Sequence, residues 1–200
     1  MSRPVLHRLG LAAAAALLPT VAFAHTGVGE AGGFAHGFLH PLTGLDHLLA
    51  MVMVGMLAWQ LGGHARWLVP ASFVVVMALG GSLGVAGTTV PFVELGIALS
   101  VVVLGSVVAL GMRLPVAAAM AVAGLFAIFH GHAHGQEMPA DVLGLSYGAG
   151  FMVGTALLHT AGLGLGMLIG RIGDRAGQVG IRATGAAAAI AGVVILTGAV

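Results

Sequence analysis

The sequence contains no cysteine and no lysine, and only 6% of its 200 residues are charged. Without cysteine, the chain can form no disulfide, no thiolate zinc site and no iron–sulfur cluster. Without lysine, it has no Walker A loop and no residue for a Schiff-base cofactor. Its nearly neutral charge balance argues against binding a nucleic acid. Because soluble domains carry about 25% charged residues, the shortage of charge itself indicates a membrane protein.

The residues that are present predict a bundle of membrane-spanning helices. Hydrophobic residues make up 59% of the chain, the mean hydropathy is +1.09, and 34 glycines would allow helices to pack closely in lipid. Six apolar segments each approach the roughly 20 residues that a spanning helix needs. We expect these helices at 41–61, 67–85, 91–112, 115–134, 143–170 and 181–200. The short connections predict one all-α, polytopic membrane bundle of six transmembrane helices over residues 25–200.

Residues 1–24 are typical of a cleaved secretory signal peptide. A basic start with Arg3 and Arg8 precedes an apolar stretch over 9–18, and Ala22 and Ala24 provide an A-x-A cleavage site. The alternative is an uncleaved first helix. Cleavage would make His25 the new N-terminus, where an amine and an imidazole could bind a metal.

The charged residues predict which end of the bundle faces the cytoplasm. With the mature N-terminus outside, every arginine after the signal peptide falls on the cytoplasmic side: Arg66, Arg113, Arg171, Arg175 and Arg182. This distribution agrees with the positive-inside rule and predicts that both mature termini lie outside. Most carboxylates and histidines would then lie at the outer face. We therefore expect a multi-pass membrane protein whose outer half is rich in imidazole and carboxylate groups.

The first polar cluster lies at the mouth of the first span and contains His36, His40, Asp46 and His47. Ionisable groups at membrane depth are costly and usually mark a pathway or a site. His40 precedes Pro41, which disfavours a helical conformation for it, so we expect His40 to cap the helix at its rim. Asp46 and His47 would lie roughly 8–10 Å deeper at 1.5 Å rise per residue. This arrangement suits the entry of a divalent cation; a structural interhelical hydrogen bond of the Asp46–His47 pair is the alternative.

A second cluster, with His130, His132, His134 and Glu137, lies at the outer end of the fourth span. The spacing of His130 and His134 places them on one helix face, which Glu137 extends, whereas His132 points the other way. A single histidine-rich loop is a weak metal signal. Two such clusters at the same membrane face predict a metal site.

Two further residues are candidates that each have a structural alternative. Glu94, in the first turn of the third span, could bind the ion or simply favour the positive end of the helix dipole. His159, within the fifth span, could pass an ion inward or be a hydrogen-bonded core histidine. For Met51 and Met53 we expect core packing, because methionine prefers soft ions and fills gaps.

One short motif points to an enzyme. The run from Gly144 through Ser146 to Gly148 matches a nucleophile elbow, but that motif requires a strand-to-helix turn. His159 would lie roughly 20 Å from Ser146 along one helix, too far for a Ser–His pair. No H-E-x-x-H zinc motif is present. We therefore predict a protein that is not an enzyme and has no prosthetic group.

Both clusters resemble the motifs of a known family. The run from His40 to His47, with Met51, resembles the first-helix signature of the HupE/UreJ family of nickel permeases, and the run from Phe129 to Glu137 resembles its second signature. Further similar positions are Val93, Glu94 and Ser100, and the run from Tyr147 through Gly150, Phe151 and Leu158 to His159. The resemblance implies an inner-membrane carrier for Ni²⁺ or Co²⁺ that supplies hydrogenase or urease maturation. It also implies that the transport residues are His40, Asp46, His47 and Glu94.

The combined prediction is a secondary transporter that captures Ni²⁺, or Co²⁺, at outer His, Asp and Glu ligands and moves it inward. The residues alone indicate only a divalent-metal site, because imidazole and carboxylate suit Ni²⁺, Co²⁺ and Zn²⁺ alike. The identity of the ion comes from the resemblance. A metal-binding membrane sensor or chaperone is the alternative, and an intramembrane metalloenzyme or hydrolase is a more remote one. The direct partners expected are the metal ion and the lipid bilayer.

Overall fold

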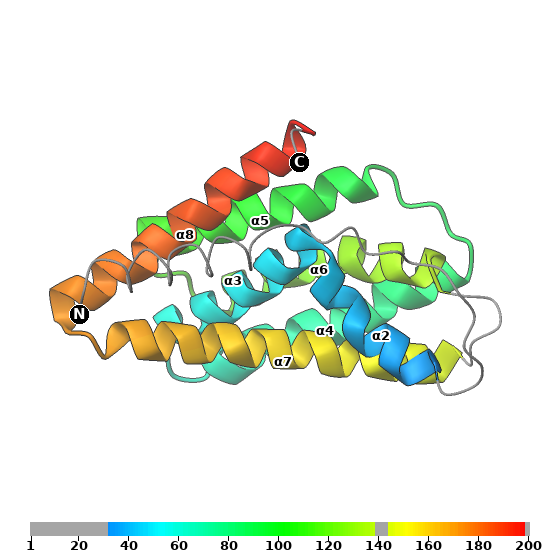
Figure 1. Cartoon of the computed structure of the whole chain (residues 1–200), viewed down its shortest axis with the longest axis horizontal. Coiled ribbons are helices and arrows are strands. Elements are labelled where there is room, and N and C mark those ends of the chain that lie inside the picture. Colours follow the sequence, from blue (N-terminus) through cyan, green and yellow to red (C-terminus); the bar gives the residue numbers. More distant parts are fainter. Residues whose placement is uncertain (1–31, 139–143, 199–200) are drawn as a thin grey trace, which may run out of the picture.

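The computed structural model describes residues 32–138 and 144–198, and all regular structure in these residues is helical. Seven helices follow one another along the chain (Figure 1): α2 Gly32–Thr43, α3 Leu45–Leu61, α4 Ala65–Val85, α5 Val93–Leu110, α6 Val116–Gln136, α7 Gly144–Gly170 and α8 Asp174–Leu196. The predicted all-α fold is confirmed for this part of the chain. The predicted signal peptide, residues 1–24, and His25 lie outside the described residues.

The helices are suited to a membrane. Each of the five helices from α4 to α8 is long and apolar enough to cross a bilayer, and α2 with α3 makes a sixth candidate span if the two count as one. These spans correspond to the six apolar segments of the sequence. The protein is therefore a multi-pass membrane bundle.

The first span differs from the single helix predicted over residues 41–61. α2 and α3 are separate helices that are bent by 84° relative to each other. The break falls at Gly44, whose extended backbone (φ −93°, ψ 124°) interrupts the helical path. Pro41 lies inside α2, so the prediction that His40 caps a helix start is wrong; His40 belongs to the last turn of α2. Pro41 has no N–H to donate to the Gly37 carbonyl one turn earlier, so it weakens the last turn of α2 just before the break at Gly44.

The last helix begins at Asp174 instead of residue 181. Its first turns carry Arg175 and Gln178, which are exposed, and a hydropathy pattern does not register such polar turns. They nevertheless pack on α7, because a Cβ atom at Gly177 would lie 2.9 Å from the Ile169 carbonyl oxygen.

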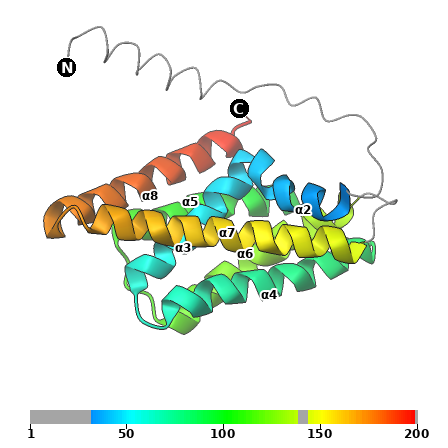
Figure 2. The ribbon, with the colours of Figure 1, turned by 60° about the horizontal axis from the view of Figure 1, so that its bottom comes forward.

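Close backbone contacts at glycines hold the bundle together. α4 packs chiefly on α6, α5 on α8, and α7 on both α2 and α3 (Figures 1 and 2). A Cβ atom at Gly131 of α6 would collide with the Met77 carbonyl of α4, and one at Gly162 of α7 would collide with the Val52 carbonyl of α3. These glycines therefore set the helix separations, as small residues do in lipid, where the hydrophobic effect does not drive helices together.

Methionine and aromatic side chains fill the space that remains between the helices. Met51, Met53, Met56 and Met77 are fully buried, together with Phe73. Met51 and Met53 thus lie in the core, in agreement with the expectation from sequence. Flexible thioether side chains adapt to irregular gaps between helices of this kind.

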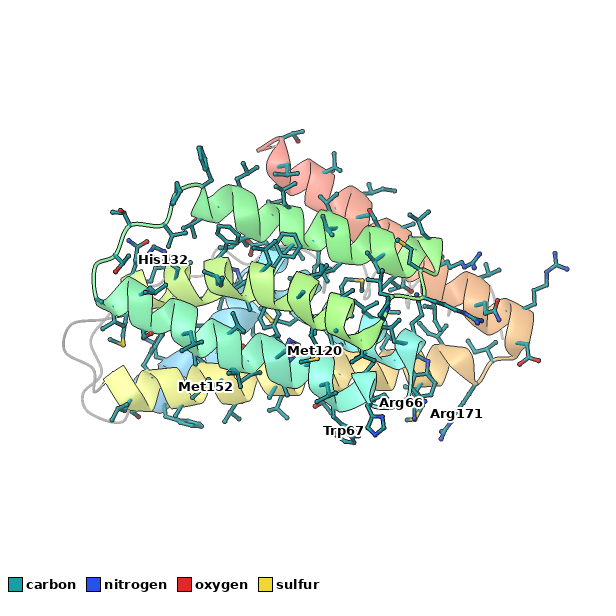
Figure 3. All side chains as sticks on the ribbon, turned by 180° about the vertical axis from the view of Figure 1, so that it is seen from behind. Arg66, Trp67, Met120, His132, Met152 and Arg171 are labelled. Carbon is teal, nitrogen blue, oxygen red and sulfur yellow. The ribbon has the colours of Figure 1, made fainter. Side chains whose placement is uncertain are left out.

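The two ends of the bundle differ in their polar side chains. Figure 3 shows His132 towards one end of the long axis and Arg66 and Arg171 at the other. We call these the histidine end and the arginine end. Trp67 lies beside Arg66 and is 76% exposed. Exposed tryptophan at the end of a span is typical of the membrane–water interface.

A pair of glycines in α7 tests whether backbone contacts hold the bundle. We expect Gly162→Ala to destabilise the protein by about 1–3 kcal/mol, since the added methyl group forces α7 away from α3. Gly164→Ala is the matched control, because a Cβ atom there meets nothing within 4 Å. Thermal unfolding of the purified variants in one detergent measures the difference. Equal melting temperatures would contradict the packing argument.

Candidate metal site

Three side chains at two helix ends meet at the histidine end of the bundle. His40 comes from the last turn of α2, His134 from the last turn of α6, and Glu137 directly follows α6. One nitrogen of each histidine and one oxygen of Glu137 all lie within 4.8 Å of one another. His40 Nε2 is 3.0 Å from Glu137 Oε2, and His134 Nδ1 is 3.8 Å from the same oxygen. We call these three residues the rim cluster; their donor atoms converge as ligands of a single ion would.

Asp46 and His47, in the first turn of α3, form a tightly bonded pair. Asp46 Oδ1 accepts hydrogen bonds from the backbone N–H of His47 (2.7 Å) and from its Nδ1 (2.8 Å). Because a carboxylate can only accept, Nδ1 carries the ring proton and Nε2 keeps its lone pair. Carboxylates that hold a histidine ring in this way orient it for metal binding. The bond joins adjacent residues, so it is not the interhelical bond considered as the structural alternative.

Gly44 leaves room for this pair. A Cβ atom at Gly44 would lie 2.8 Å from Asp46 Oδ1 and 3.2 Å from His47 Nδ1. A larger residue would therefore push into the carboxylate and the imidazole. The break between α2 and α3 and the Asp46–His47 pair depend on the same glycine.

Imidazole rings follow one another from the rim cluster into the bundle. The ring centroids of His40 and His134 are 4.7 Å apart, and those of His134 and His47 are 4.4 Å apart. His130 continues the series, with its ring centroid 4.6 Å from that of His47. Thus one motif in α2 and α3 and a second in α6 form a single file of four rings.

The hydrogen bonds of His130 leave one of its nitrogens available. Ser100 Oγ donates its proton to the Ile97 carbonyl and accepts a hydrogen bond from His130 Nε2 at 2.9 Å. Nδ1 of a neutral His130 then keeps its lone pair, which is buried without a hydrogen-bond partner in the described residues. His47 Nε2 is likewise buried without a hydrogen-bond partner among the described residues. Both lone pairs are available to a cation.

His159 lies deeper, on the far side of Phe73. The Phe73 ring centroid is 5.6 Å from that of His130 and 5.1 Å from that of His159. Both nitrogens of His159 are buried, and neither has a hydrogen-bond partner among the described residues. A hydrogen-bonded core histidine, the structural alternative for this position, would have such a partner. Leaving a buried polar group unpaired costs about 1–3 kcal/mol, which a ligand could offset.

The remaining three predicted residues, His36, His132 and Glu94, belong neither to the rim cluster nor to the file of imidazole rings. His36 is exposed on α2, with its ring centroid 5.8 Å from that of His40. His132 is buried, but its Nε2 donates to the Thr88 carbonyl at 2.6 Å and so ties α6 to the α4–α5 connection. Glu94 is exposed in the first turn of α5.

Two aromatic residues of α7 complete the surroundings, and sequence reasoning had not placed them at the site. The Phe151 ring centroid is 3.9 Å from that of His134, and the Tyr147 ring centroid is 6.0 Å from that of His40. The sequence signals were the resemblance of both positions to a family pattern and their spacing of four residues, which puts both rings on one face of α7. Within the described residues, the Tyr147 hydroxyl is buried without a hydrogen-bond partner.

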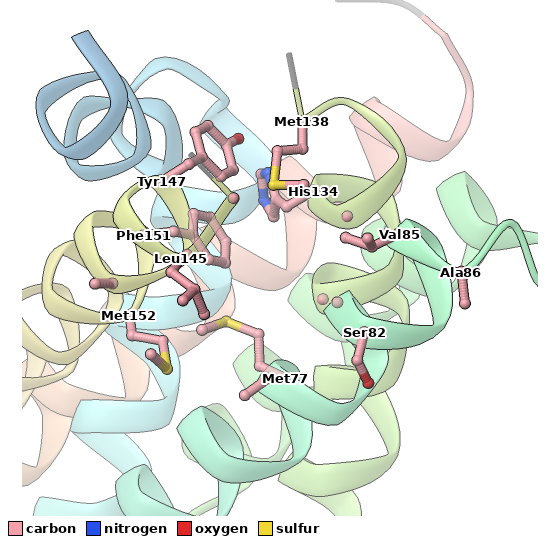
Figure 4. Close-up of a pocket in the computed structure, with 17 residues that line it drawn as sticks. Met77, Ser82, Val85, Ala86, His134, Met138, Leu145, Tyr147, Phe151 and Met152 are labelled. Carbon is pink, nitrogen blue, oxygen red and sulfur yellow. The ribbon is translucent and has the colours of Figure 1, made fainter. Parts of the chain in front are cut away.

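A largely apolar cavity of about 580 Å³ adjoins His134 between α4, α6 and α7 (Figure 4). Met77, Met138, Phe151 and Tyr147 contribute to its wall. His134 is buried, and most of its neighbours on this side are apolar. Interactions between an ion and its ligands are stronger in such low-dielectric surroundings than in water.

The rim cluster has the charge that a cation site needs. The hydrogen bond with His40 is the main cause that lowers the pKa of Glu137 below its usual value of 4.5. Glu137 is therefore an ionised carboxylate at neutral pH. One carboxylate oxygen with several imidazole nitrogens is a donor set that suits divalent first-row metal ions.

The run from Gly144 to Gly148 does not form a nucleophile elbow. It forms the first turns of α7, so Ser146 is a helical residue without the strand-to-helix turn that the motif requires. The geometry thus removes the sequence indication for a hydrolase.

The rim cluster predicts a measurable loss of metal affinity in one variant. We expect Glu137→Gln to weaken Ni²⁺ binding to the purified protein about tenfold or more, because it removes the only charged ligand of the cluster. Isothermal titration calorimetry in detergent gives the dissociation constant. Asp174→Asn, which removes an exposed carboxylate at the arginine end, should bind Ni²⁺ as the wild type does. Equal losses in both variants would argue against the rim cluster.

The chain is similar to known proteins over nearly its whole length. Residues 13–195 match the family described as HupE / UreJ protein. The protein named Protein HupE from Rhizobium leguminosarum bv. viciae is 49% identical over 185 residues, which cover 92% of this chain and 95% of that protein. No solved structure matches the chain. The resemblance carried by the two histidine motifs is thereby confirmed. The chain belongs to the HupE/UreJ family, a family of membrane permeases associated with nickel and cobalt uptake.

Proposed function

We propose that the protein is a secondary transporter that moves Ni²⁺, or Co²⁺, inward across the bacterial inner membrane. The family's association with nickel and cobalt uptake supports the choice of ion. The multi-pass bundle and the oxygen and nitrogen donors of the rim cluster support transport of a divalent cation. The metal would reach hydrogenase or urease maturation inside the cell, a link that the name of the relative suggests.

The observation that carries this proposal is the file of imidazole rings. It begins at the rim cluster, where solvent reaches Glu137, and continues through His47 to the fully buried His130. A protein that only held the ion would need the rim ligands alone. Unpaired lone pairs that continue into the membrane region indicate passage, because ionisable groups at that depth are costly without a function.

Each residue has a role that follows from its contacts. Glu137, His40 and His134 would replace part of the water shell of the ion at the rim. Asp46 would keep His47 Nε2 available as the next ligand, and His130 Nδ1 would follow. His159 would be the innermost station, beyond Phe73. The exposed Glu94 and His36 would attract the ion to the histidine end, and His132 would position α6.

The membrane potential can supply the driving force. The sequence has no Walker A motif. A divalent cation that crosses 100 mV inward gains about 4–5 kcal/mol, which suffices for uptake without ATP. This direction places the histidine end outside and the arginine end in the cytoplasm, as the positive-inside rule requires.

Metal uptake in cells tests the proposal directly. We expect His47→Ala and Asp46→Ala to lower uptake of radioactive nickel about tenfold or more, because the first removes a ligand and the second removes the group that orients it. His64→Ala is the control, since His64 is exposed near the arginine end. Western blotting of membranes confirms equal amounts of protein. If all four proteins accumulate nickel equally, the transporter is excluded.

His159 separates transport from mere binding. We expect His159→Gln to lower nickel uptake about tenfold while the purified protein binds Ni²⁺ as the wild type does, because His159 is remote from the rim cluster. A sensor or chaperone that holds the ion at the rim predicts no uptake by any variant. Competition by Co²⁺, Zn²⁺ and Cu²⁺ in the same uptake assay shows which ion the site prefers.

A further inference from the structure

The arginine end contains a second, chemically opposite site. A cavity of about 380 Å³ lies between the α3–α4 turn, the α5–α6 connection and α8. Three guanidinium groups contribute to its lining: Arg66 from the first turn of α4, Arg113 from the α5–α6 connection and Arg182 from α8. Gln60 and Gln178 add two amides, and no carboxylate among the described residues lines the cavity.

The positive charge of this cavity is not neutralised by the described part of the chain. Every ion pair among the described residues joins a histidine to a carboxylate. No described carboxylate therefore lies within 4.0 Å of an arginine nitrogen. Asp174, the acidic residue of the α7–α8 turn, is exposed and does not line the cavity. Arg66 Nε is buried and lacks a hydrogen-bond partner among the described residues. Like charges that face one space repel each other, and an unpaired buried donor is costly.

Three of the polar side chains that line the cavity, Arg66, Arg182 and Gln60, have contacts that restrict their positions. The guanidinium group of Arg66 stacks on the Trp59 ring, with Cζ 4.5 Å from the ring centroid. The guanidinium of Arg182 lies against Gly111, where a Cβ atom would be 2.8 Å from Nη2. Gly111 also has φ of +65°, a backbone conformation that favours glycine. Glycine is thus favoured at position 111 both by this conformation and by the closeness of the Arg182 guanidinium. Gln60 Nε2 donates to the Met112 carbonyl at 3.3 Å and links α3 to the α5–α6 connection.

We propose that this cavity binds a phosphate group. Planar guanidinium groups present paired N–H donors that match phosphate oxygens, and an anion would relieve their mutual repulsion. The phosphate could belong to the headgroup of an anionic lipid, since basic pockets between spanning helices bind such headgroups at the cytoplasmic side. Free phosphate has the same chemistry.

Membrane topology alone does not require that three arginines line one cavity. The positive-inside rule asks for arginines on one side, and exposed positions such as Arg171 and Arg175 satisfy it without lining a cavity. A bound phosphate would join α4, the α5–α6 connection and α8, which are far apart in the sequence. It would thus hold the helix ends opposite the rim cluster.

Ligand binding to the purified full-length protein tests the site and separates the two sources. Native mass spectrometry with phosphatidylglycerol, and with diacylglycerol as the lipid that lacks phosphate, reports headgroup binding. Thermal unfolding with and without inorganic phosphate reports free-anion binding. The test variant is Arg66→Gln with Arg182→Gln; the matched control is Arg171→Gln with Arg175→Gln, which removes the same charge outside the cavity.

We expect the wild type and the control to retain phosphatidylglycerol over diacylglycerol, or to be stabilised by phosphate. Each guanidinium contributes about fivefold to such binding, so the test variant should bind about 25-fold more weakly. The single variant Arg113→Gln should bind about fivefold more weakly. Because the Arg113 side chain is exposed, this variant replaces the double variant in the test if the double variant does not fold. Retention of the lipid identifies the headgroup as the source, and stabilisation by phosphate alone identifies the free anion. Equal binding by test and control variants, or no preference for phosphate in the wild type, overturns the proposal.

Discussion

At Gly44 the chain turns from α2 into α3 through 84°, and this turn brings both histidines of one sequence motif to His134. In a straight helix, His40 and His47 would be separated by about 10 Å along the axis. After the bend, both rings contact His134, at 4.7 Å and 4.4 Å between centroids. Gly44 is needed because a Cβ atom would reach Asp46 Oδ1 at 2.8 Å. The same residue therefore breaks the helix and leaves space for the carboxylate that orients His47.

The bend has its effect only because glycines hold the neighbouring helices close. α2 lies against α7 at Gly37 and Gly150, where added Cβ atoms would collide with the backbone of Tyr147 and Phe34. α6 lies equally close to α4 at Gly131 and Gly135. In lipid, such contacts replace the hydrophobic effect as the source of specific packing. The separation of the ligands at the rim is therefore set by backbones, which move less than long side chains.

Between the two polar ends, the interior combines a tightly packed core with unpaired imidazole nitrogens. Hydrogen bonds to Asp46 and to Ser100 assign one nitrogen of His47 and of His130 as a donor and leave the other as a lone pair. Such second partners orient a ligand without competing with the ion. Buried polar groups without partners are costly, so in the proposed transporter a cation would gain more from these nitrogens than from a fully hydrogen-bonded wall.

The sequence by itself determined the all-α class, the number of apolar segments, the family, and the side-chain types at the site, because hydropathy and histidine spacing are local properties. It could not show that residues 41–61 are not one helix, since Pro41 usually begins a helix and Gly44 has no fixed preference when read alone. Nor could it show that Glu137 pairs with His40, 97 positions away, or that Glu94 stays exposed. The tertiary structure decided these points through the glycine contacts, because only helix packing determines which of many polar side chains meet.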